Sequence, residues 1–155
     1  MKYICLIILM TLCLSHGIRA QIRDNKNLIF FEFGGNGGAY SINYDRTLIN
    51  NFGARAGIML LPSASGTIKA FPVLFNYRIN INNNFVELGL GETFFSAPLN
   101  FGNLGNFTDN SAIPTGVIAL GIQNERGMNF RTAFTPFYYN KKFVFFGGFS
   151  LGYSF

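Results

Sequence analysis

The last thirteen residues of the sequence, 143–155, alternate between large apolar and small side chains. From Phe149 to Phe155 the odd positions hold Phe, Leu, Tyr and Phe, and the even positions from Gly148 to Ser154 hold glycine or serine. Side chains of a β-strand point to opposite faces with a period of two residues. The segment therefore predicts a strand with one aromatic face and one small, polar face. The aromatic face has to be covered by lipid or by other protein.

Residues 1–20 have the pattern of a secretory signal sequence. Lys2 precedes an apolar run over residues 3–14, and Ala20 offers a small residue at the expected cleavage site. These are the three parts of such a signal, and the run is too short to cross a bilayer as a helix, which needs about 20 residues. We expect cleavage after Ala20, which leaves residues 21–155 as one small domain.

The expected mature chain contains no cysteine and no histidine, because Cys5, Cys13 and His16 all lie in the signal. Cys13 is a poor lipoprotein acylation site, since the large Leu12 precedes it. Disulfides and thiolate metal sites are therefore excluded, and the usual general base is missing. We expect no cofactor, no tightly bound transition metal, and no hydrolase or acyltransferase activity.

The charge of the mature chain is modest. Of the 12 basic residues, Lys2 and Arg19 belong to the signal, which leaves ten against 7 acidic residues and a net charge of +3. The ten are scattered along the chain, which argues against nucleic-acid binding. Aromatic residues make up 17% and charged residues only 12%, whereas soluble domains contain about 25% charged residues. With no apolar run long enough for a membrane helix after the signal, a closed β-barrel is the remaining way to cross a bilayer.

Eight segments of the mature chain alternate in character, and turn residues separate them. They are residues 28–34, 39–45, 52–60, 69–79, 85–94, 116–123, 128–138 and 143–155. An even number of strands is typical of single-chain bacterial barrels. The pattern predicts an all-β fold, an eight-stranded antiparallel up-and-down transmembrane β-barrel. In this reading residues 35–38 form a tight outer turn and residues 95–115 a long outer loop.

Charged side chains fall on the inward face of six predicted strands. Three are acidic and three are basic: Glu32, Asp45, Arg55, Arg78, Glu87 and Arg131. An eight-stranded barrel is just wide enough for side chains to fill it, and buried charges must pair. We therefore predict a salt-bridged polar network that fills the lumen. A gated polar path or a small-ligand site is the alternative reading of the same residues.

The predicted outer loop carries apolar residues among glycine and asparagine. Those with the greatest capacity for contact are Phe95, Phe101, Leu104 and Phe107. They either pack over the mouth of the barrel or form a contact surface for a partner protein, a surface glycan or a lipid headgroup. The sequence does not identify that partner.

Two segments resemble a known family. Residues 131–137 (RTAFTPF) and the ending 148–155 (GFSLGYSF) are similar to the last hairpin of short outer-membrane β-barrel proteins of Bacteroidetes-type bacteria, and the Ala20-Gln21 junction is similar too. The close resemblance covers about the last 30 residues of the chain. It implies an OmpA/OmpX-like eight-stranded barrel in the outer membrane of a Gram-negative cell, and it implies no catalytic residues. The outer loops are short for that type of barrel, which argues against an adhesin.

Together these features predict a non-enzymatic outer-membrane barrel that has a structural role or an interaction role through the 95–115 loop. Its expected partners are outer-membrane lipid and the barrel-insertion machinery, which would read an insertion signal formed by Phe149, Leu151, Tyr153 and Phe155. We expect a monomer. A narrow pore for small solutes is the first alternative. A soluble lipocalin-like carrier is the second, and it would need a polar exterior.

Overall fold

The computed structural model describes residues 26–63, 66–96, 99–100, 106–107 and 111–155. The predicted signal, residues 1–20, lies outside the described residues, as do Phe101 and Leu104 of the predicted loop. Among the residues that are described, no helix combines the length and the apolar character needed to cross a membrane.

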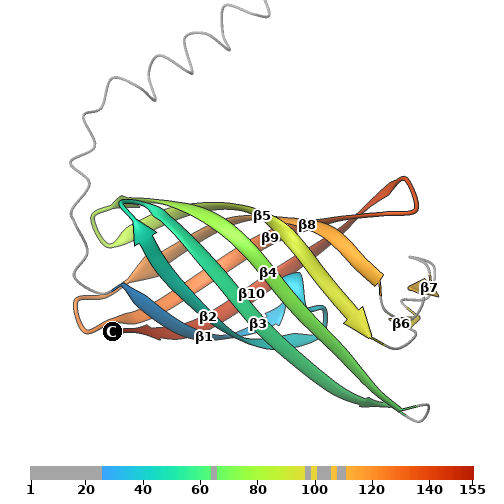
Figure 1. The fold of residues 1–155 in the computed structure, drawn as a ribbon. Helices are drawn as coiled ribbons and strands as arrows, with labels where there is room; N and C mark the ends of the chain where they lie inside the picture. The colour runs from blue at the N-terminus through green and yellow to red at the C-terminus, as the bar shows by residue number, and fades with distance from the viewer. Residues whose placement is uncertain (1–25, 64–65, 97–98, 101–105, 108–110) are drawn as a thin grey trace, which may run out of the picture.

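Eight long strands form a closed antiparallel barrel (Figure 1). Around the barrel the order is β1-β10-β9-β8-β5-β4-β3-β2. Their bounds are β1 Asn27–Gly34, β2 Tyr40–Ile49, β3 Phe52–Ser63, β4 Gly66–Ile81, β5 Asn84–Ser96, β8 Ser111–Gln123, β9 Met128–Tyr139 and β10 Lys142–Ser154. The prediction of an eight-stranded up-and-down barrel is therefore confirmed.

Three short elements complete the described chain. A 3₁₀ turn, η1, spans Gly35–Gly37 between β1 and β2, and the paired strands β6 (Leu99–Asn100) and β7 (Asn106–Phe107) lie between β5 and β8. The prediction for residues 95–115 was too long at both ends, because β5 continues to Ser96 and β8 begins at Ser111.

Burial alternates along the long strands, apart from residues 115–117 of β8, which are all buried. In β1 the outward residues Ile29 and Phe33 are 48% and 62% exposed, whereas the inward Phe30 is 2% exposed. Large apolar side chains cover the exterior in the same way on the other strands, with Phe75 at 70% and Leu90 at 75%. The exterior is thus apolar and the interior holds both polar and apolar groups, which is the distribution that a bilayer requires.

The two ends of the barrel differ in their connections. At the end where β1 begins and β10 ends, the connections are short. Asn50 and Asn82 lie there with φ of 51° and 56°, a conformation that asparagine tolerates better than most residues. The ring closes at this end, where Asn27 and Phe155 exchange two backbone hydrogen bonds of 3.0 and 2.9 Å. The hairpins β3–β4 and β9–β10 project from the opposite end (Figure 1).

Candidate functional site

The barrel interior contains six charged side chains whose signs alternate along one connected path. We call this path the charged chain; its order is Arg55, Glu32, Arg131, Glu87, Arg78, Asp45. The six residues come from six different strands, and each occupies an inward position of its strand. All six are at most 9% exposed. The structure thus brings together every residue of the predicted lumen network.

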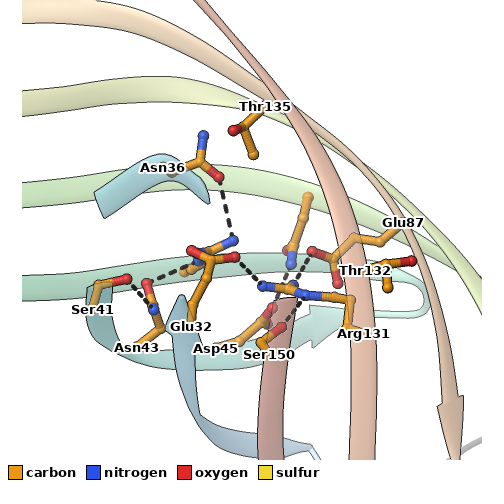
Figure 2. Close-up of polar contacts among 12 residues, drawn as sticks. Glu32, Asn36, Ser41, Asn43, Asp45, Glu87, Arg131, Thr132, Thr135 and Ser150 are labelled. Carbon is orange, nitrogen blue, oxygen red and sulfur yellow. Dashed lines mark hydrogen bonds and ion pairs between the residues drawn. The ribbon is translucent and has the colours of Figure 1, made fainter. Parts of the chain in front are cut away.

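Arg131 lies at the centre of the charged chain. Its Nη2 is 3.0 Å from Glu32 Oε1 and its Nη1 is 2.6 Å from Glu87 Oε1. Its Nε donates a 3.0 Å hydrogen bond to Ser150 Oγ (Figure 2). Glu32 accepts a second ion-pair hydrogen bond, from Arg55 Nη2, at its other carboxylate oxygen. The central guanidinium therefore has all of its nitrogens engaged, which is what a buried arginine needs.

The other end of the charged chain is looser. Arg78 Nη2 lies 2.5 Å from Glu87 Oε2 but 3.5 Å from Asp45 Oδ2. Asp45 Oδ2 also accepts a hydrogen bond of 2.5 Å from Asn76 Nδ2. Arg78 is 9% exposed and Asp45 4%, whereas Glu87 is fully buried. The charged chain is thus weakest at Asp45.

Two phenylalanines pack against the guanidinium groups. The ring centroid of Phe30 is 4.7 Å from Arg55 Cζ and 4.2 Å from Arg131 Cζ, and that of Phe85 is 4.6 Å from Arg78 Cζ. Attraction between a cation and an aromatic face strengthens when both are desolvated. Phe30 therefore contacts two guanidinium groups and stabilises both.

The turn η1 folds into the lumen instead of facing outward (Figure 1). Asn36 is fully buried, and its Nδ2 donates to Thr115 Oγ1 at 2.7 Å and to Gly116 O at 2.9 Å. Thr93 Oγ1 donates a 2.9 Å hydrogen bond to Asn36 O, and Arg55 Nη1 lies 3.5 Å from Asn36 Oδ1. The tight turn predicted at 35–38 is present between β1 and β2, but it folds into the lumen, because Asn36 finds polar partners inside the barrel.

An apolar cluster fills the interior at the end where the hairpins project. It consists of Met59, Ala70, Phe95, Ile113, Phe137 and Val144. The predicted contact residue Phe95 belongs to this cluster: it lies in β5, is 3% exposed, and its ring centroid is 6.2 Å from that of Phe137. Its assignment to a contact loop was therefore wrong, since the strand alternation continues past Phe94 and turns Phe95 inward. Phe107 lies in β7.

The predicted insertion residues lie on the outer face of the last strand. Phe149, Leu151 and Tyr153 are 51%, 44% and 52% exposed, and Phe155, just after β10, is 51% exposed. They form one continuous outward row that runs beside β1 and ends at the short-turn end of the barrel.

The charged groups of the interior pair with one another and so join strands of the barrel. Each carboxylate of the charged chain accepts from at least one guanidinium, so none is available as a free general base. The charged chain, η1 and the apolar cluster lie in succession along the lumen, and their members are almost fully buried.

Several interior residues did not stand out in the sequence. Asn36 lies in a glycine-rich turn that gave no sign of its role, and Phe30 was indistinguishable from other strand phenylalanines.

Glu92, which the sequence analysis did not single out, points to the exterior of the barrel. The alternation of β5 could have predicted this orientation, because Glu92 lies two residues after Leu90 and four after Leu88, on the same outward face.

Comparison with known proteins supports the fold. No protein-family model matches the chain, and no curated protein matches it by sequence. Among solved structures, the barrel is similar to the Yersinia pestis outer membrane protein Ail in a phospholipid bilayer nanodisc, with a TM-score of 0.55 and 13% sequence identity. The match covers 85% of this chain and 100% of that chain. The fold is thus that of an outer-membrane β-barrel.

Proposed function

We propose that the chain is a non-enzymatic barrel of the bacterial outer membrane, with a closed interior and a structural or interaction role. The observation that carries this proposal is the apolar exterior of a closed barrel whose charges are turned inward. In water such an exterior would be an aggregation surface, whereas in a bilayer it is the required one. A soluble lipocalin-like carrier does not fit this distribution.

The proposal includes the predicted processing and environment. Residues 1–20 would direct secretion and be removed, and residues 21–155 would insert with the aid of the barrel-insertion machinery. The bacterial group suggested by the resemblance of the last hairpin is part of the same proposal. The match to a protein solved in a phospholipid bilayer supports lipid contact.

A closed interior is favoured over a narrow pore. Arg55, Glu32 and Glu87 are at most 1% exposed although they lie in the lumen, so side chains take up the space that water would need. Opening a path would require breaking ion pairs whose partners would then be buried alone, at several kcal/mol for each ion.

The interaction role would fall to the outer end of the barrel, through the segment between β5 and β8. Within that segment β6 and β7 pair as a short hairpin, with Leu99 opposite Phe107. A hairpin at this end of the barrel would be accessible to a partner outside the membrane.

Two measurements test the proposal. Protein of residues 21–155 folded in lipid should migrate faster on a gel when unheated than when boiled, as a stable barrel does. Single-channel recording in planar bilayers should then show no steady conductance. Absence of heat-modifiable migration would refute the membrane barrel. A steady conductance would be compatible with the barrel but would show that its interior is a pore and not closed.

A further inference from the structure

Glu92 is a charged residue on the apolar exterior of the barrel. In β5 it alternates with Leu90 and Phe94, which are 75% and 45% exposed, and it is itself exposed. Its cross-strand neighbours are Val73 and Pro114. None of the ion pairs among the described residues includes Glu92. An ionisable residue among lipid-facing side chains is costly to keep and is therefore a functional-site hypothesis.

The strand register places Glu92 within the apolar belt. The next outward pair toward the projecting hairpins is Phe71 with Phe94, and beyond it Lys69 pairs with Ser96. An aromatic pair thus separates Glu92 from the polar rim. The carboxylate has to reach past these rings to water or find a partner beside them.

An apolar groove of about 490 Å³ begins next to Glu92. Leu90 and Gly116, which line it, form the residue pair adjacent to Glu92 and Pro114. Residues two apart in a strand are separated by about 7 Å. From there the groove extends over Leu88 and Ile118 toward Phe52 and Tyr77 near the short-turn end; Phe75 and Pro136 complete its apolar lining.

We propose that Glu92 and this groove form a binding site for a membrane lipid with a primary ammonium headgroup. One acyl chain would lie in the groove, and the ammonium group would donate hydrogen bonds to the Glu92 carboxylate. The headgroup is chosen for its charge complementarity to the Glu92 carboxylate. A carboxylate only accepts hydrogen bonds, which an ammonium group can donate, and it repels a phosphate that lacks a neighbouring cation. This inference rests on the proposed membrane location.

We expect a lipid rather than a protein segment as the occupant, because the groove is lined almost entirely by apolar residues and is open along the bilayer-facing wall. Its lining residues are aliphatic, aromatic or glycine apart from Asn76, and the hydroxyl of Tyr77 is the other polar side-chain group. A single carboxylate at one end of an apolar channel matches an amphiphile that has one polar end.

The test compares lipid retention by the folded barrel. Purified protein would be incubated with equal amounts of phosphatidylethanolamine and phosphatidylcholine with identical acyl chains, and the retained lipid measured by native mass spectrometry. We expect about fivefold preference for phosphatidylethanolamine, the factor that corresponds to about 1 kcal/mol. Glu92→Gln should bring the ratio to about one, whereas Glu125→Gln, in the exposed turn between β8 and β9, should retain the preference.

A second pair of variants tests the groove itself. Ile118→Phe should lower the retention of both lipids, whereas Leu60→Phe, similarly exposed and outside this groove, should not. A ratio near one in the wild-type protein, or an unchanged ratio in Glu92→Gln, would overturn the proposal. So would a lipid-free complex of two copies that Ile118→Phe disrupts.

Folding is scored separately by heat-modifiable migration. If the wild-type protein migrates as a folded barrel but shows no preference, only the lipid site fails. If the wild-type protein does not fold in lipid, the membrane location fails and the lipid site fails with it.

Discussion

Arg131 of β9 and Glu87 of β5 lie 44 positions apart in the sequence, and their side chains meet at 2.6 Å inside the barrel. The two strands are not neighbours, because β8 lies between them. The same guanidinium also bonds to Glu32, 99 positions away in β1. Arg131 therefore links strands across the lumen, which the backbone ladder of the wall cannot do.

The central position of Arg131 predicts a large effect of its removal. Arg131→Ala should lower the free energy of unfolding by about 3–5 kcal/mol, because it leaves Glu32 and Glu87 buried without their shared cation. Lys141→Ala, at an exposed position of the β9–β10 turn, should change it by less than about 0.5 kcal/mol. Urea unfolding of both variants in lipid or detergent measures the difference. Equal, small effects would mean that water reaches the charged chain and would favour the pore.

An acid inside the charged chain and the acid at its end should respond differently to the loss of their charge. Glu87→Gln removes the carboxylate that lies 2.6 Å from Arg131 and 2.5 Å from Arg78, and should cost about 3–5 kcal/mol. Asp45→Asn removes a single ion pair of 3.5 Å at a slightly exposed position, and should cost about 1 kcal/mol. The same urea experiment compares them. A larger loss for Asp45→Asn would contradict the order of bonding described here.

The number of strands, and which side chains of each strand lie inward, could be predicted from the sequence because both depend on local alternation. Glu32 and Arg131 were assigned inward on parity alone, and they lie inward. Which charges pair could not be predicted, because pairing depends on the tilt and stagger of all strands together. The contact between β9 and β5 is an example, since no local pattern relates Arg131 to Glu87.

The errors of the sequence reading lie at the outer end of the barrel. The proline at position 114 interrupts the pattern of β8, so residues 111–115 were read as loop although they pair with β5. Proline is tolerated at this position because the pairing of β8 with β9 begins only at Thr115, so one edge of β8 is unpaired at Pro114. The inward fold of η1 depends on contacts of Asn36 with distant Thr93 and Thr115, which local sequence does not encode.

The glycine-rich turn should be sensitive to any side chain at Gly35. This residue has φ of 72°, and an added Cβ would lie 2.5 Å from Glu32 Cδ. Gly35→Ala should therefore destabilise the barrel by at least about 2 kcal/mol, since a left-handed conformation alone costs about 1–2 kcal/mol for a non-glycine residue. Gly147→Ala, where an added Cβ meets nothing within 4 Å, is the matched control. Urea unfolding that gives the same midpoint for both variants would show that η1 does not pack on Glu32.

The last strand should carry information for insertion as well as stability. Phe155 is 51% exposed, while its backbone exchanges hydrogen bonds of 3.0 and 2.9 Å with Asn27. Deleting Phe155 would remove both hydrogen bonds, so Phe155→Ala is the better test, because it keeps the backbone and removes only the outward ring.

Phe52→Ala is the matched control: it removes an outward ring, 60% exposed, from β3 near the same end of the barrel. If Phe155 belongs to a signal that the insertion machinery reads, Phe155→Ala should lower the yield of folded protein in the outer membrane severalfold, whereas Phe52→Ala should not. The two purified variants should nevertheless unfold at similar urea concentrations, since both lose one lipid-facing ring. Quantifying heat-modifiable protein in isolated outer membranes measures the first effect and urea unfolding the second. Equal yields of the two variants would assign the terminal aromatic a purely lipid-facing role.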